Sequence, residues 1–269
     1  MVDKRRMCPH CRAFITTDDK ICPYCGEKVG PRAIEVRDPG ALLGGLIPHA
    51  RLVTSLILLI NGGLFLATLL YSREVGEGRA LLAFGGKYGP ALTLGHQYWR
   101  LLTAGFLHGG WLHILMNSWV LMDLGAEVET TYGKARLMVI YFLATIAGFY
   151  VSWWHSPGLS VGSSAGITGL LGAMVALGVR NRTALGVAIR NHYLRWTAYI
   201  LVIGLVVDGV DNFAHIGGFA AGFVVAYLAR DPIHSKASTE MLWSTVAGVC
   251  VVATALCFFE MYINFTSRF

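Results

Sequence analysis

The chain has 269 residues, of which 55% are hydrophobic and only 14% are charged. Soluble globular domains carry about 25% charged residues, so this composition excludes an ordinary soluble domain and predicts a chain that lies mostly in a bilayer. The formal net charge of +6 does not indicate nucleic acid, because no basic face interleaved with aromatic residues accompanies it. Membrane proteins gather basic residues on their cytoplasmic side, which explains the charge more simply.

The amino-terminal segment 1–30 is polar and holds four of the six cysteines, as the pairs Cys8 with Cys11 and Cys22 with Cys25. Two such pairs with two residues between partners are typical of a four-thiolate zinc site. A disulfide interpretation requires an oxidising compartment, whereas this basic segment is expected in the cytoplasm. A redox pair normally occurs singly on a different fold. The sequence therefore predicts a cytoplasmic zinc ribbon that binds a structural Zn²⁺ ion.

Residues 31–50 contain prolines, glycines and charges, and are predicted to form a linker. No apolar stretch follows the basic residues at positions 4–6, so we expect no secretory signal peptide.

The rest of the chain contains apolar runs that approach the roughly 20 residues needed to cross about 30 Å of hydrocarbon. The seven predicted spans are 52–72, 112–127, 136–155, 164–180, 195–210, 213–230 and 240–262. Residues 51–232 are therefore expected to form a six-span core, and residues 233–269 to add one carboxyl-terminal transmembrane helix. The predicted fold class is an all-α polytopic membrane protein preceded by a small zinc ribbon.

The basic residues predict the orientation of these spans. If the amino terminus lies inside, Lys and Arg occur in every cytoplasmic connection, while the outer connections at 156–163 and 208–212 have none. We therefore expect a multi-pass protein of a bacterial inner or plasma membrane with a cytoplasmic amino terminus. The long outer connection 73–111 is too apolar to be a solvated tail and is expected to lie partly in the membrane interface.

Polar residues interrupt the predicted spans near their outer ends. His113 and Asn117 are four residues apart and therefore share one face of the second span. Ser164 lies between Gly162 and Gly166 at the start of the fourth span. Small neighbours admit a substrate there, and the helix amino terminus offers backbone N–H groups, as a serine nucleophile requires.

His215 opens the sixth span and is followed by Gly218 and Gly222, a spacing that lets another helix approach closely. If that helix is the fourth span, His215 comes within reach of Ser164. Each of these residues alone has a structural explanation, because intramembrane polar groups and glycines often serve helix packing. Together they supply a nucleophile, a base and two hydrogen-bond donors.

At these residues the chain resembles the rhomboid family of intramembrane serine proteases. The residues that carry the resemblance are Trp99 with Arg100, His108, His113 with Asn117, Gly125, Glu129, Gly133, Gly162 with Ser164, and Ala214 with His215 and Gly218. The resemblance implies a six-span core, and the seventh span is similar to the six-plus-one arrangement of part of the family. It also implies that Arg100, Glu129 and His108 shape the first outer loop.

Carried over residue by residue, the resemblance implies that Ser164 is the nucleophile and His215 the general base. His113, Asn117 and the backbone N–H of Ser164 would form the oxyanion hole, without a catalytic cofactor. Ser163 is a rival nucleophile that ranks lower, because only Ser164 has a glycine two residues before it. A Ser–His dyad is favoured over a triad.

The expected function is cleavage of single-span membrane proteins near the extracytoplasmic face. The expected partners are these substrates and the lipid bilayer, and no nucleic acid is expected to bind. Ala165 and Thr168 depart from the family pattern, which usually has Gly and often an aromatic residue at these places. They keep an alternative open: a catalytically weak or inactive rhomboid-like protein that binds membrane clients. A transporter is disfavoured, because few polar residues continue toward the inner face. The partner of the zinc ribbon is unknown.

Overall fold

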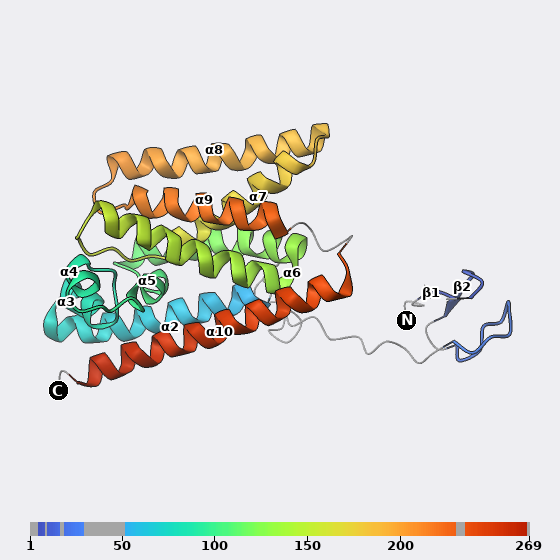
Figure 1. Ribbon diagram of the computed structural model, residues 1–269, viewed down its shortest axis with the longest axis horizontal. Coiled ribbons are helices and arrows are strands. Elements are labelled where there is room, and N and C mark those ends of the chain that lie inside the picture. Colours follow the sequence, from blue (N-terminus) through green and yellow to red (C-terminus); the bar gives the residue numbers. More distant parts are fainter. Residues whose placement is uncertain (1–4, 9, 17–18, 30–51, 230–234, 268–269) are drawn as a thin grey trace. The chain divides into compact units, whose positions relative to one another are not determined.

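The computed structural model describes residues 5–8, 10–16, 19–29, 52–229 and 235–267 (Figure 1). The chain divides into two compact units, 1–46 and 47–269. The predicted linker 31–50 and the predicted boundary between residues 232 and 233 lie outside the described residues and stay predictions.

The amino-terminal unit contains one small antiparallel sheet of β1 (Arg5–Met7) and β2 (Phe14–Thr16). Its buried cluster consists of Cys8, Ile15, Cys22 and Val29. With 46 residues, the unit is close to the size of about 40 residues below which a chain usually needs disulfides or a metal in order to fold alone. The cysteines are therefore part of what holds this unit together.

The second unit is made of helices. They are α2 (Leu52–Val75), α3 (Glu77–Ala83), α4 (Gly89–Thr93), α5 (Arg100–Thr103), η1 (Ala104–Phe106, a 3-10 turn), α6 (Trp111–His155), α7 (Ser164–Arg180), α8 (Ala184–Val206), α9 (Asn212–Ala229) and α10 (Ala237–Thr266). Within the described ranges, α2, α6, α9 and α10 are long and apolar enough to cross a membrane, and α7 is a shorter apolar helix. This architecture confirms the prediction of an all-α polytopic chain.

Gly133 divides α6 into two helices. Its φ of 81° is left-handed, a conformation that glycine reaches without strain, and the helix changes direction there without a loop. The two parts of α6 correspond to the second and third predicted spans. The connection between α2 and α6 holds the short helices α3, α4 and α5.

The bounds predicted for the fifth span, 195–210, were wrong, because α8 begins 11 residues earlier at Ala184 and ends at Val206. The helix begins directly after Thr183, whose hydroxyl accepts a hydrogen bond from the Gly186 N–H, a typical amino-terminal cap. Its first half contains Asn191 and His192, which are exposed side chains. A span prediction that requires a continuous apolar run leaves this half of the helix out. An α-helix nevertheless tolerates polar residues on an exposed face.

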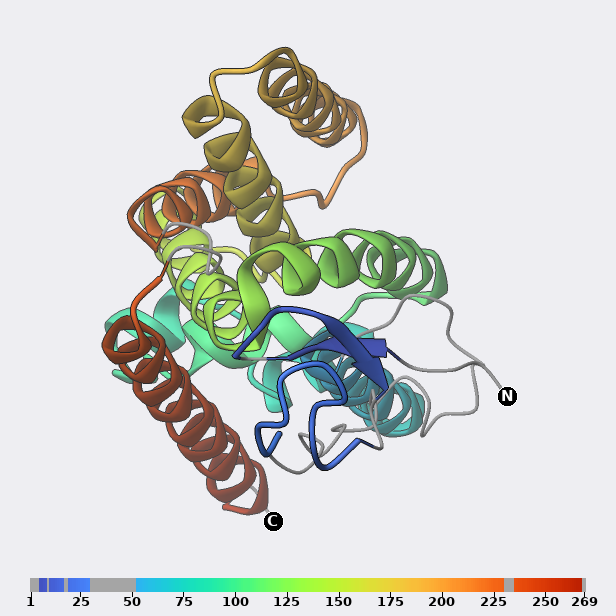
Figure 2. The ribbon, with the colours of Figure 1, turned by 90° about the vertical axis from the view of Figure 1, so that its right-hand side faces the viewer.

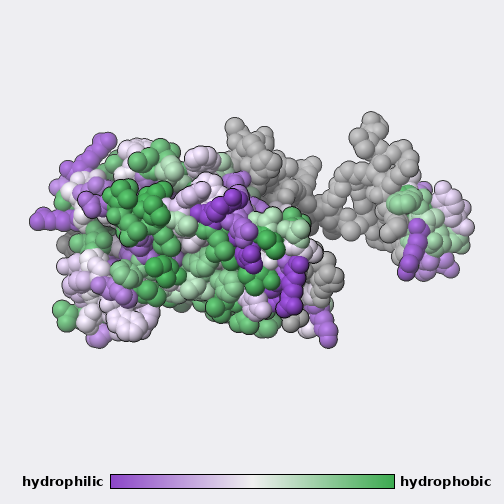
Figure 3. Space-filling view, turned by 90° about the horizontal axis from the view of Figure 1, so that it is seen from above, coloured by the Kyte–Doolittle hydropathy of each residue, from purple (hydrophilic) through white to green (hydrophobic). Residues whose placement is uncertain are grey.

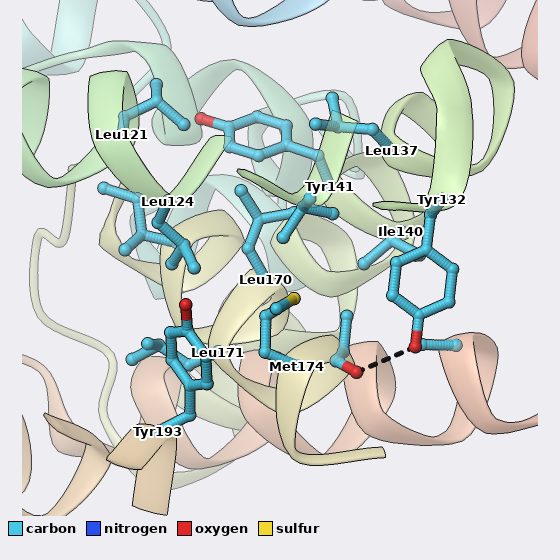
Figure 4. Packing of buried hydrophobic residues seen from close by; sticks show 14 of the residues in the cluster. Leu121, Leu124, Tyr132, Leu137, Ile140, Tyr141, Leu170, Leu171, Met174 and Tyr193 are labelled. Atoms are coloured by element: carbon cyan, nitrogen blue, oxygen red, sulfur yellow. Dashed lines mark hydrogen bonds between the residues drawn. The ribbon is translucent and has the colours of Figure 1, made fainter. Parts of the chain in front are cut away.

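Helix α7 is the centre of the bundle and packs against α6, α8 and α9 (Figure 2). Three α7 residues lie in one buried hydrophobic cluster with residues of α6 (Figure 4). They are Leu170, Leu171 and Met174, and their partners in the cluster include Leu121 and Ile140. The hydroxyl of Tyr132 donates a hydrogen bond of 3.0 Å to the carbonyl of Ala173, which satisfies a polar group inside this apolar contact.

Apolar side chains also cover much of the outer surface of the helical unit. On α8, for example, Tyr199, Val202, Leu205 and Val206 are all more than half exposed. The face seen from above in Figure 3 carries wide green areas of hydrophobic side chains between hydrophilic ones. Exposed apolar area of this extent suits contact with lipid rather than water.

Glycines bring α7 and α9 into backbone contact. A Cβ atom at Gly218 would lie 2.1 Å from the carbonyl oxygen of Ala165, and one at Gly222 would lie 2.0 Å from that of Gly169. Neither glycine can therefore be replaced without moving a helix. This confirms the prediction that these glycines let the fourth span approach the sixth.

Replacing Gly222 with valine is expected to separate α7 from α9 and to lower the melting temperature in detergent. Overpacking a tight site costs about 1–3 kcal/mol, which corresponds to roughly 2–10 °C for a chain of this size. Gly248→Val is a matched control, since a Cβ at this α10 glycine meets nothing within 4 Å. Equal melting temperatures of the two variants, measured by tryptophan fluorescence, would contradict the close contact.

Glu129 does not shape the outer loop, so that expectation was wrong. Its carboxylate accepts hydrogen bonds from the N–H groups of Val53 (3.3 Å) and Thr54 (3.1 Å) and from the Thr54 hydroxyl (3.0 Å). The negative charge thus lies at the positive amino-terminal end of α2, opposite the loop. Arg100 does organise the loop, because its guanidinium donates to the carbonyl oxygens of Leu82 and Gly86.

Candidate active site

Gly162 forms the turn that leads into α7 and thereby presents Ser164. Its φ is 137°, and a Cβ atom there would lie 2.7 Å from Nε2 of His113 and 3.4 Å from Oγ of Ser164. Glycine is therefore needed both for the backbone conformation and for space. The turn consequently lies directly against the His113 ring of α6.

Ser164 and His215 are in hydrogen-bond contact. The distance from Ser164 Oγ to His215 Nε2 is 2.9 Å, which is a normal hydrogen-bond length. His215 lies in the first turn of α9 and is only 5% exposed. The glycine contacts between α7 and α9 thus bring together a hydroxyl and an imidazole that are 51 residues apart.

The second nitrogen of His215 has no carboxylate partner in the part of the chain that the structure describes. Nδ1 is buried and has no hydrogen-bond partner among the described residues. The carboxylate of Asp211 accepts hydrogen bonds from the Ser152 hydroxyl and the Ala214 N–H instead. Within the described part of the chain, the arrangement is a Ser–His pair rather than a triad.

Two hydrogen-bond donors lie on one face of the first part of α6. Nδ1 of His113 accepts from the Gly109 N–H at 3.4 Å, so a neutral ring carries its proton on Nε2, the atom that faces the Gly162 turn. One helical turn further, the Asn117 amide nitrogen is buried and has no partner among the described residues. A buried donor without an acceptor, such as this amide, is rare, and both groups are able to donate a hydrogen bond to a negative oxygen.

Ser163, the rival nucleophile, is completely buried. Its hydroxyl lies 3.2 Å from Nε2 of His108, whose ring makes an edge contact with the ring of His113. A side chain without exposed surface offers no approach to a substrate. Ser163 and His108 therefore form a supporting layer behind the Ser164 turn.

The two departures from the family pattern leave the Ser–His contact in place. The Ala165 methyl group is buried and packs toward Gly148, where an added Cβ would lie 2.9 Å away. Thr168 turns its hydroxyl to the carbonyl of Ala165 within its own helix, at 3.0 Å. Neither side chain stands between Ser164 and His215.

The amino-terminal cysteines form the second candidate site. Their four Sγ atoms all lie within 4.8 Å of one another, and the Cys8–Cys25 and Cys11–Cys22 distances are both 3.7 Å. Sulfurs bound at about 2.3 Å around a tetrahedral ion lie about 3.8 Å apart, whereas a disulfide requires about 2.05 Å. The four thiols are free and fit a metal ion rather than two disulfides.

Sequence reasoning missed Lys87. Its ammonium group is buried in the loop between α2 and α6 and donates to the carbonyl oxygens of Ser156 and Gly158, at 3.0 Å each. A single lysine in a loop carries no pattern that marks it, and its acceptors are backbone atoms, which every sequence has.

Comparison with known proteins connects this geometry with a family. Residues 95–232 match the Rhomboid domain. The chain is 37% identical to Rhomboid protease GluP of Bacillus subtilis over 146 residues, which are 54% of this chain and 29% of that protein. It is 34% identical to Rhomboid-like protease 3 of Toxoplasma gondii over 161 residues, or 57% of this chain and 60% of that protein.

A third relative carries a different description. Inactive RHOMBOID-like protein 8 of Arabidopsis thaliana is 35% identical over 138 residues, which are 50% of this chain and 39% of that protein. The chain thus spans less than two thirds of the length of each of these relatives. Because the matched domain covers about half of the chain and includes Ser164 and His215, the chain belongs to the rhomboid family.

Proposed function

We propose that the chain is an intramembrane serine endopeptidase that cleaves single-span membrane proteins near the extracytoplasmic face. The observation that carries the proposal is the 2.9 Å contact between Ser164 Oγ and His215 Nε2. A serine hydroxyl is a weak nucleophile unless a base accepts its proton, and a neutral imidazole is such a base. Relatives that are named as proteases support the same class of reaction.

In the first step, Ser164 Oγ attacks the carbonyl carbon of the scissile peptide bond while its proton passes to His215 Nε2. A new C–O bond forms, and the carbonyl oxygen becomes an oxyanion. The Nε2–H of His113, the amide of Asn117 and the backbone N–H of Ser164 donate to this oxygen. Each such donor contributes about 2.7–4 kcal/mol in known oxyanion holes.

In the second step, the C–N bond breaks and the leaving amine takes the proton from His215. Water then attacks the acyl ester, with His215 again as the base, and releases the new carboxyl terminus and free Ser164. The water must come from the outer side, because the lipid core supplies none.

The proposed orientation places the amino terminus and the cysteine unit in the cytoplasm. Lys134 lies at the turn inside α6, Arg182 lies between α7 and α8, and Lys236 lies directly before α10. These connections lie on one side if the helices alternate through the bilayer, and their basic residues support a cytoplasmic side. The Ser164 turn then opens toward the opposite side.

A fluorophosphonate probe tests the proposal. We expect it to label the wild-type protein, with the adduct on Ser164 in a peptide map, and to leave Ser164→Ala unlabelled. Ser163→Ala is the matched control and is expected to keep the label. In liposomes, only labelled proteins should cleave a single-span substrate. An adduct on Ser163, or equal labelling of Ser164→Ala, would contradict the assignment.

The alternative function is an inactive rhomboid-like protein that binds membrane clients. The similarity to a relative named as inactive, together with Ala165 and Thr168, favours it. The alternative predicts that the wild-type protein retains a single-span client in a pull-down but is neither labelled nor able to cleave it. Labelling of Ser164 with cleavage in the same preparation excludes it.

We also propose that Cys8, Cys11, Cys22 and Cys25 bind one structural Zn²⁺ ion, because four thiolates match the ligand preference of zinc. We expect elemental analysis to find one zinc per wild-type chain and a clear loss in Cys22→Ser. Cys250→Ser, which changes a cysteine of α10, is the control and should keep the ion. Full zinc content in Cys22→Ser would contradict the four-thiolate site.

A further inference from the structure

Lys87 fastens the outer loop to the segment that delivers Ser164. The Lys87 side chain is fully buried, and its Nζ donates to the carbonyl oxygens of Ser156 and Gly158, at 3.0 Å each. Its backbone N–H donates to the Ser160 carbonyl at 3.0 Å, and the Ser160 N–H donates back at 2.9 Å. One loop residue thus holds segment 156–160 at three places, only four residues before the nucleophile.

Asp211 holds the turn that delivers His215. One carboxylate oxygen accepts the Ala214 N–H at 3.0 Å, which is the typical contact of a helix amino-terminal cap. The other oxygen accepts the hydroxyl of Ser152 at the end of α6. The backbone carbonyl of Asp211 accepts the N–H of His215 at 3.1 Å. The position of His215 therefore depends directly on Asp211.

The charges of Lys87 and Asp211 stabilise each other. Burial lowers the pKa of Lys87, and the charge of Asp211 opposes that effect. Burial raises the pKa of Asp211, but hydrogen bonds from Ser152, Ser160 and Ala214 and the charge of Lys87 outweigh it and hold the pKa below its usual value. Segment 152–160 connects the two residues by hydrogen bonds: Ser152 donates its hydroxyl to Asp211, and Lys87 bonds Ser156 and pairs its backbone with Ser160.

We propose that Lys87 and Asp211 form a positioning pair that sets the contact between Ser164 and His215. Lys87 acts through segment 156–163 and Asp211 acts through the first turn of α9, and neither residue touches the reacting atoms. The proposal rests on the proposed function, because a positioning role requires that Ser164 and His215 react. The pair would keep the hydroxyl and the imidazole in reacting geometry. Misplacement of a catalytic group by about 1 Å lowers a rate by about 10²-fold.

Kinetics of Lys87→Met, Asp211→Asn and the double variant test the pair in liposomes. We expect each single change to lower kcat about 10- to 100-fold and to leave KM within about twofold, because the substrate-binding surface is unchanged. The effects of residues that act as one unit are not additive. The kcat of the double variant should therefore be no lower than that of the slower single variant. Exposed Lys134→Met and Asp208→Asn are matched controls with the same chemical changes.

A role in fold stability alone predicts a different result. It would lower the melting temperature and the fraction of folded protein, while kcat per fluorophosphonate-titrated site stayed at the wild-type value. A wild-type kcat per titrated site, or additive losses in the double variant, would overturn the proposal.

Hydrogen exchange tests the coupling without proteolysis. In Lys87→Met we expect faster amide exchange both in 156–164 and in 212–216, although Lys87 contacts only the first of these segments by hydrogen bonds. Ser152→Ala, which removes only the hydroxyl that donates to Asp211, is the milder variant if Lys87→Met does not fold. Unchanged protection of 212–216 in the folded variants would overturn the proposal. Cleavage by Ser164→Ala would instead sink the proposed function, and the exchange result would still decide the pairing.

Discussion

Alanine at His215 is expected to lower kcat about as far as alanine at Ser164, by roughly 10⁴-fold or more, and the double variant no further. The reason is that the two side chains act as one unit: without the base the hydroxyl keeps its proton, and without the hydroxyl the base has no nucleophile to activate. Single-turnover cleavage of a single-span substrate in liposomes measures all three variants.

His192→Ala is the control for this series, because it removes an exposed histidine of α8 whose Nε2 accepts a hydrogen bond from Trp196 in the same helix. We expect it to cleave at the wild-type rate. If the losses of Ser164→Ala and His215→Ala multiplied in the double variant, or if His215→Ala kept more than a tenth of the activity, the two residues would not form a dyad.

The second large effect is expected at the oxyanion donors. His113→Ala and Asn117→Ala should each lower kcat about 10²–10³-fold, the loss observed when one donor is removed from an oxyanion hole. KM should change little, because the negative charge that they stabilise exists only in the transition state. Steady-state kinetics in liposomes separate the two parameters.

Asn191→Ala, which removes an exposed amide from α8, is the matched control for Asn117→Ala. Asn117→Asp offers a sharper comparison, since it keeps the size of the side chain but replaces the donor with a negative acceptor. It should be at least as slow as Asn117→Ala. An increase in KM without a fall in kcat would mean that His113 and Asn117 bind substrate instead.

The helices that the sequence predicts well are those whose apolar length a bilayer dictates. The predicted spans 164–180 and 213–230 agree within a residue or two with α7 and α9. In contrast, the apolar start of α8 is interrupted by Arg190, Asn191 and His192, so its first half does not form a continuous apolar run. Thr183, which caps the start of α8, is a typical amino-terminal cap residue in the sequence. A span prediction that counts only apolar residues does not use this signal.

The meeting of Ser164 and His215 could be predicted because two regular patterns point to it. Charge alternation places both residues at one depth, and Gly218 with Gly222 marks the helix face that approaches α7. Lys87 and Asp211 could not be predicted in the same way. Their partners are carbonyl and N–H groups of the backbone, which become specific only after the loops are folded.

The length and burial of α7 have a consequence for how the bilayer acts on the protein. Its 17 residues rise about 26 Å, less than the roughly 30 Å of a hydrocarbon core. Only Val179 and Arg180 at its far end are exposed, so lipid tails barely touch this helix. Hydrophobic mismatch then acts mainly on the less buried helices such as α2 and α10, which can tilt in response. Membrane thickness would therefore shift the depth at which a substrate is cut, while the spacing of hydroxyl and imidazole stays set by protein contacts.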